Sequence, residues 1–168
     1  GGSSEPYEVN LRMSDVSEVS LQGYPNNTNL QVCWHNSTGP VPSVRAYLVH
    51  GPMDNLSMDT YAVNGVGSTN SANGFASAAA MNGLPNCFTV TGRSNPRLLR
   101  MSSFYNDVPV FVFPTGGNLL PNQGILIESV GVVQDTERVN RALKTKPFAP
   151  IDFDYLLLQK TTSSPLSN

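Results

Sequence analysis

The stretch FYNDVPVFVFPTGG, residues 104–117, decides the fold class of this chain. Its centre, VPVFVF, predicts a β-strand, because β-branched and aromatic residues fill it and a Pro-Thr-Gly-Gly turn ends it. In a strand, Val110 and Val112 point to one face while Phe111 and Phe113 point to the other. Both faces are therefore apolar, and we expect each of them to be covered.

Upstream of this stretch, short strand patterns alternate with turns. Segments 8–13 (EVNLRM) and 29–35 (NLQVCWH) alternate apolar with polar residues, as half-buried strands do. Shorter strands are expected at 44–49, 61–63, 88–90 and 98–101, between Asn-, Gly- and Pro-rich turns. The pattern predicts an all-β fold, an antiparallel β-sandwich with Greek-key or jelly-roll-like connections and little helix. Segment 73–83 (NGFASAAAMNG) carries a helical hint that is too short, so we expect a loop or a short turn there.

The last third of the chain holds two more apolar segments. In NLLPNQGILIESVGVV (118–133), a turn at Pro121 and Gly124 precedes a strand, which we expect to pair with the strand at 108–113. Alternating charges follow in ERVNRALKTK (137–146). The segment PFAPIDFDYLLLQ (147–159) then predicts a final strand that is apolar on both faces.

Length and composition bound the organisation of the chain. A chain of 168 residues, 39% of them hydrophobic, is long enough for one domain that buries roughly two thirds of its surface. We interpret residues 1–2 as a remnant of cloning, 3–160 as a single domain and 161–168 as a flexible tail. Charged residues make up 13% and the net charge is −2, which argues against nucleic acid or an anionic membrane surface as a partner.

The two cysteines, Cys33 and Cys87, predict a disulfide. A chain rich in Ser, Thr, Asn, Gly and Pro with few charges is typical of secreted or surface domains, where a cysteine pair is oxidised. A metal site is disfavoured because His35 and His50 fit no zinc-ligand spacing. A catalytic pair of Cys33 with His35 is disfavoured, because side chains two residues apart on a strand are roughly 7 Å apart, too far for direct proton transfer. A catalytic pair with His50 stays open, since the fold could bring His50 close to Cys33.

A resemblance emerges from the C-terminal half. The run PRLLRMSSFYNDVPVFVFPTGGNLLPNQGILIESVGVV, followed by ERVNRALKTK and PFAPIDFDYLLL, resembles the soluble domain of minor pilin-like proteins of bacterial type IV pili, of the Gram-positive or candidate-phylum type. The order of the elements and the Phe-Asp-Tyr triplet at 153–155 carry the resemblance. The N-terminal leader and long apolar helix of pilins are absent from this sequence, so the resemblance implies that they were removed.

The resemblance implies a structural role in pilus assembly, tip display or adhesion. The protein would be extracellular, on the cell surface, and anchored in the membrane by the removed helix before assembly. Its partners would be other pilin subunits and a host-cell surface or glycan. The expected contacts to the helix or to other subunits are made by Phe111, Phe113, Leu156, Leu158, Arg138 and Arg141.

Two other functional classes make different demands on the sequence. A secreted sugar-binding β-sandwich or an adhesin unrelated to pili would need exposed aromatic platforms. Tyr24, next to Pro25, is the best candidate for an exposed ligand-binding aromatic, whereas Trp34 alternates with Leu30 and Val32 and is expected in the core. An enzyme is not expected, because no nucleophile stands in an elbow context and no histidine lies near a carboxylate in sequence. No cofactor is expected.

Overall fold

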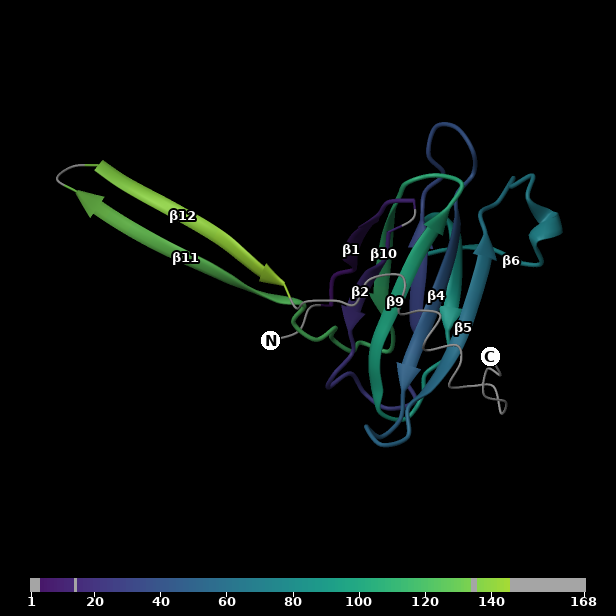
Figure 1. Cartoon of the computed structure of the whole chain (residues 1–168), viewed down its shortest axis with the longest axis horizontal. Helices are drawn as coiled ribbons and strands as arrows, with labels where there is room; N and C mark the ends of the chain where they lie inside the picture. The colour runs from purple at the N-terminus through teal and green to yellow at the C-terminus, as the bar shows by residue number, and fades with distance from the viewer. Residues whose placement is uncertain (1–3, 14, 134–135, 146–168) are drawn as a thin grey trace, which may run out of the picture.

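The computed structural model describes residues 4–13, 15–133 and 136–145, which form two five-stranded sheets and a separate two-stranded hairpin (Figure 1). The strands are β1 (Tyr7–Leu11), β2 (Ser17–Ser20), β3 (Leu30–Trp34), β4 (Ser43–His50), β5 (Ser57–Asn64), β6 (Ala76–Ser77), β7 (Ala79–Met81), β8 (Leu84–Val90), β9 (Pro96–Phe104), β10 (Val108–Pro114), β11 (Gly124–Val133) and β12 (Thr136–Thr145). One short 3₁₀-helix, Ser71–Asn73, precedes β6. The expected strand at 147–159, the tail at 161–168 and residues 1–2 lie outside the described residues.

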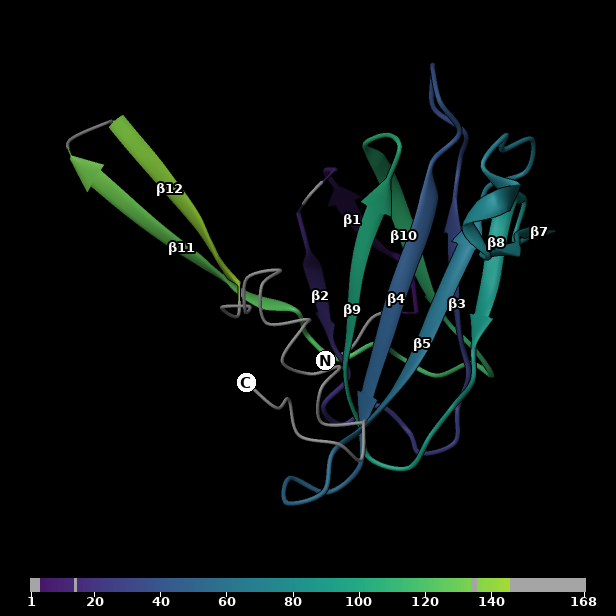
Figure 2. The ribbon, with the colours of Figure 1, turned by 45° about the vertical axis from the view of Figure 1, so that its right-hand side comes forward.

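The two large sheets face each other as the layers of a sandwich (Figure 2). The first sheet has the order β1-β10-β3-β8-β7 and the second has the order β2-β9-β4-β5-β6. All their pairs are antiparallel except the two-residue pairing of β5 with β6. The prediction of an all-β antiparallel sandwich is confirmed.

The pairing of eight strands of the sandwich, all except the short β6 and β7, is nested. β4 pairs with the next strand β5, and around this hairpin β3 pairs with β8, β2 with β9 and β1 with β10. From the inside out, these four pairs alternate between the second sheet and the first. Within the first sheet β10 also pairs with β3, and within the second sheet β9 also pairs with β4, so each sheet is continuous. The chain therefore behaves as one long hairpin whose two arms are rolled into the sandwich.

The core lies between the two sheets and follows the alternation read from the sequence. Leu30, Val32 and Trp34 of β3 point inward and are almost completely buried, as predicted for Trp34. From the other sheet, Leu99 and Met101 of β9 meet them in the same apolar cluster. Because both inner faces leave water together, this layer supplies most of the hydrophobic stabilisation of the fold.

The strand that decides the fold, β10, lies between β1 and β3 in the first sheet. Val110 and Val112 point into the core and are fully buried, so the opposite sheet covers this face. Phe111 and Phe113 point outward, are half-buried, and pack on a cluster formed by the two cysteines and Leu84. The domain itself thus provides cover for both apolar faces, and the second face does not need a removed helix to explain it.

Two local predictions were wrong. Segment 73–83 forms the short strands β6 and β7, because Asn82 and Gly83 both adopt positive φ in a two-residue hairpin turn that pairs β7 with β8. The strand after Pro121 pairs with β12 and not with β10, because β1 and β3 already occupy both edges of β10.

No helix among the described residues is long and apolar enough to cross a membrane.

Leu99 and Leu119 provide a matched test of this core. Leu99 is completely buried and Leu119 is 50% exposed. We expect Leu99→Ala to lower the free energy of unfolding by about 2–5 kcal/mol, because it removes buried methyl groups and leaves a cavity. Leu119→Ala should change it by less than about 0.5 kcal/mol. Urea unfolding of both variants measures the difference, and equal losses would contradict the assigned core.

Candidate interaction site: a projecting hairpin and the disulfide face

The hairpin of β11 and β12 is the most unusual feature of the molecule. Each strand has ten residues, and the antiparallel register runs from Gly124 opposite Thr145 to Val133 opposite Thr136. Only two residues, 134 and 135, separate the strands in the sequence. At about 3.3 Å per residue the hairpin is about 33 Å long.

The hairpin projects away from the sandwich (Figure 1). Its strands pair with each other and, within the part of the chain that the structure describes, with no strand of either large sheet. The outer edges of β11 and β12 therefore present backbone N–H and C=O groups that no described strand pairs. Such edges can accept a further strand.

The side chain of Gln123 fixes the base of the hairpin to the sandwich. Gln123 Oε1 accepts a hydrogen bond from the backbone N–H of Ser20 at 2.7 Å, and Gln123 Nε2 donates to the carbonyl of Ser20 at 3.0 Å. Both backbone groups belong to β2, the edge strand of the second sheet. Leu120, three residues before Gln123, is buried in the core. The start of β11 is therefore positioned, while the strands beyond it extend outward.

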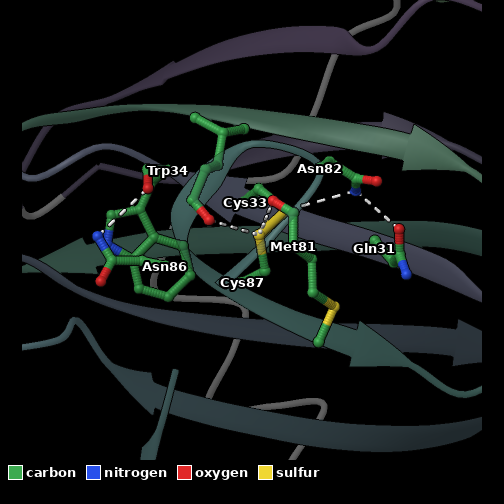
Figure 3. The surroundings of a disulfide bond; sticks show 8 residues. Gln31, Cys33, Trp34, Met81, Asn82, Asn86 and Cys87 are labelled. Atoms are coloured by element: carbon green, nitrogen blue, oxygen red, sulfur yellow. Dashed lines mark hydrogen bonds between the residues drawn. A yellow bond between two sulfur atoms is a disulfide. The ribbon is translucent and has the colours of Figure 1, made fainter. Parts of the chain in front are cut away.

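The two cysteines lie on the outer face of the first sheet. Cys33 of β3 is directly opposite Cys87 of β8, and the two form a disulfide (Figure 3). The turn between β7 and β8 closes over it, where Asn82 Nδ2 donates to Gln31 Oε1 at 2.7 Å. The predicted disulfide is confirmed. Because both sulfurs are bonded, the catalytic Cys/His alternative is excluded, and His35 instead packs edge-on against Phe111.

Tyr24 corrects the prediction of an exposed aromatic. It is only 4% exposed, and its ring belongs to the core between the sheets. Its hydroxyl donates to the carbonyl of Asn29 at 3.0 Å and accepts from the N–H of Thr115 at 3.3 Å. Burial raises the pKa of Tyr24, and the hydrogen bonds with Thr115 offset part of this rise. Tyr24 is therefore not positioned to stack against a ligand in solution.

The remaining predicted contact residues are distributed unevenly. Phe111 and Phe113 are half-buried against the cluster of Cys33, Cys87 and Leu84. Arg138 and Arg141 lie on β12, opposite Gly131 and Glu128 of β11. Leu156 and Leu158 lie outside the described residues. The structure thus separates the two phenylalanines, on a sheet face, from the two arginines, on the hairpin.

Two small groups of oppositely charged side chains lie among the described residues. Arg100, only 1% exposed, donates to Glu18 across β9 and β2. Asp59 accepts from Arg93 Nε at 2.6 Å, which raises the pKa of Arg93, and lies 3.6 Å from His50 Nε2. Within the described residues, no group of three or more His, Cys, Asp and Glu side chains could hold a metal ion.

Sequence reasoning missed the hairpin, although a signal was present. GILIESVGVV and TERVNRALKT are two strand-length segments separated by two residues, which is the spacing of a tight hairpin. Because the first segment directly follows β10 in the sequence, adjacency alone predicts β10 as its partner.

Comparison of the chain with protein family models, curated proteins and solved structures finds no match.

Reduction should weaken the domain strongly. The disulfide closes a loop with a sequence separation of 54 residues, for which the chain-entropy model gives about 4 kcal/mol. We expect urea unfolding with a reductant to give a free energy of unfolding lower by about 2–4 kcal/mol. The double variant Cys33→Ala, Cys87→Ala should show the lower stability with or without reductant. A wild-type chain whose stability does not change on complete reduction would contradict this expectation.

Tyr24→Phe tests the buried hydroxyl. We expect a loss of about 1–2 kcal/mol at neutral pH, since the change leaves the carbonyl and N–H partners without the hydroxyl. The raised pKa means that the unfolded chain loses the phenol proton first, so wild-type stability is complete below about pH 10 and falls as pH rises through the folded-state pKa. Tyr24→Phe should reduce this alkaline loss.

Proposed function

We propose that this chain is a structural subunit of a multi-copy assembly, in which the sandwich is the building block and the β11–β12 hairpin is the arm that binds a neighbouring subunit. The observation that carries the proposal is the projecting hairpin with its two open edges. The proposal concerns assembly and not catalysis.

The first support is energetic. An isolated two-stranded hairpin is marginally stable in water at best, and three strands or a packing partner are needed for independent stability. This hairpin is built of β-formers such as Ile125, Ile127 and Val130, and it lies away from the core of its own sandwich. Pairing with a neighbour would supply a third strand and would bury apolar surface. A second copy of the chain is the simplest such neighbour.

The second support is topological. We infer that the nested pairing of β1 with β10, β2 with β9, β3 with β8 and β4 with β5 makes the sandwich a jelly roll. Jelly rolls serve as viral capsid subunits, lectin domains and cupins. Here core side chains, including Trp34, Leu30 and Leu99, fill the space between the sheets, where a cupin would hold its ligand. This argues against the cupin class among the three.

The resemblance to minor pilin-like proteins points to the same general role, a subunit of a surface assembly. That identity stays a prediction, together with the extracellular location, the removed helix and the adhesive contacts. A shell subunit and a pilin subunit differ in where the arm binds. In a shell the hairpin pairs with the sandwich of the next copy, whereas in a pilus an N-terminal helix would provide the main contact.

The sugar-binding alternative loses the residue on which it depended. Tyr24 is buried and hydrogen-bonded inside the domain, so it offers no stacking platform. Among the described residues, the one Phe, Tyr or Trp side chain that is exposed, Tyr105, is 38% exposed and accepts a hydrogen bond from Asn73. No second function is therefore proposed.

Replacing the hairpin tests the assembly role. Residues 125–144 are exchanged for Asn-Gly, which closes a short turn between the paired residues Gly124 and Thr145. We expect the wild-type chain to associate with rising concentration and the variant to remain monomeric, because the arm is lost. Analytical ultracentrifugation measures both, and urea unfolding should show that the sandwich keeps its stability within about 1 kcal/mol.

Met53→Ala serves as the control, because Met53 is 72% exposed on the loop between β4 and β5, and its loss should leave association unchanged. A wild-type chain that stays monomeric at every concentration would overturn the proposal. Association of the hairpin variant at the same strength as wild type would overturn it as well.

A further inference from the structure

The outer face of the second sheet is buried, although it points away from the core. Ala46 and Leu48 of β4 face inward, so Tyr47 and Val49 face outward. On β9, Arg100 and Ser102 face outward in the same way. Tyr47 is 3% exposed and Arg100 is 1% exposed. We call Arg45, Tyr47, Val49, Arg100 and Ser102 the outer face. In a two-layer sandwich such positions normally meet water.

The described strands do not account for this burial. The opposite sheet lies on the inner side, and the neighbours of β9 and β4 within their own sheet are β2 and β5. The remaining strand pair, β11–β12, projects away from the sandwich (Figures 1 and 2). No described strand or helix is stacked on the outer face.

The outer face has a defined chemistry. The guanidinium of Arg45 lies 5.2 Å from the ring centre of Tyr47 and 5.0 Å from that of Phe104. Arg100 donates to Glu18 at its border. The face thus combines aromatic and aliphatic surface with one more guanidinium than carboxylate. Arg45 Nε and Ser102 Oγ are buried, and neither has a hydrogen-bond partner among the described residues. An occupant with apolar side chains and carboxylates or carbonyls would fit it.

The path of the chain leads to this face. β12 ends at Thr145, which is paired with Gly124, and the preceding Gln123 is hydrogen-bonded to Ser20 on β2. The described chain therefore ends next to the edge strand of the second sheet, and twenty-three residues, 146–168, follow in the sequence. Crossing from β2 to β5 covers about 15 Å at the spacing of sheet strands. An extended chain spans this distance in about five residues.

The sequence of this segment complements the outer face. PFAPIDFDYLLLQ, residues 147–159, supplies three aromatic and several aliphatic side chains, carries Asp152 and Asp154, and contains no basic residue. Its apolar side chains match Tyr47 and Val49, and its carboxylates match the excess of guanidinium groups. We propose that the outer face of the second sheet is the docking surface for segment 147–159 of the same chain. This inference does not rest on the assembly role of the hairpin.

Two truncations test the docking. A chain ending at Lys146 lacks the segment, and a chain ending at Lys160 lacks only the last eight residues and is the matched control. We expect the shorter chain to bind the hydrophobic dye ANS with fluorescence raised severalfold and to melt at a lower temperature. The control should behave as wild type. A synthetic peptide of residues 147–160 should bind the shorter chain and return its dye signal to the wild-type level.

The carboxylates provide the second readout. A peptide with Asp152→Asn and Asp154→Asn should bind about tenfold more weakly, and its binding should depend less on salt. Should the shorter chain fail to fold, the same two substitutions in the full chain should raise ANS fluorescence above wild type. Unchanged fluorescence in every variant, or no binding of the wild-type peptide to a folded shorter chain, would overturn the proposal.

A second copy as the occupant is distinguishable from the chain's own segment. If the segment docks within one chain, dye binding by the full chain is low and independent of concentration. A dye signal that falls only as the chain associates would assign the segment to a neighbour and overturn the proposal. The variant without the hairpin should keep the low dye signal, so failure of the assembly role leaves this test intact.

Discussion

The two five-stranded sheets bury their inner faces against each other, and this layer of apolar side chains fixes the position of every other feature. Trp34 from one sheet and Leu99 and Met101 from the other belong to this single cluster. The strands are held edge to edge by pairings that are mostly distant in sequence, such as β1 with β10. The core therefore forms only when the whole nested arrangement is complete, which makes cooperative unfolding the expected behaviour.

The outer surface of the sandwich carries its own stabilising devices. On the first sheet, the disulfide joins β3 to β8 and provides an apolar platform for Phe111 and Phe113. On the second sheet, the ion pair of Arg100 with Glu18 and the stacking of Arg45 on Tyr47 and Phe104 create a face with different chemistry. The two sides of one sandwich are thus suited to different contacts.

A complete core also explains why the last third of the chain is so apolar. The sheets bury each other without β11 or β12, and the residues after β12 are not needed to close the described sandwich. The apolar residues from β11 onward are then available for the surfaces proposed above, a neighbouring subunit for the hairpin and the outer face for the C-terminal segment. This division of roles is common to the assembly and docking proposals.

The sequence alone determined the fold class, most strand positions, the burial of Trp34 and the cysteine pair, because strand periodicity, turn residues and the redox preference of cysteines are local or compositional properties. It did not determine which strands are neighbours. Nothing near the end of β10 indicates that β1 and β3 occupy both its edges and leave β11 to pair with β12. Likewise, Tyr24 is buried because its ring packs in the core between the sheets, where Thr115, 91 residues away, meets its hydroxyl. Such contacts were decided by the tertiary structure, since edge pairing and burial depend on long-range register that no short segment encodes.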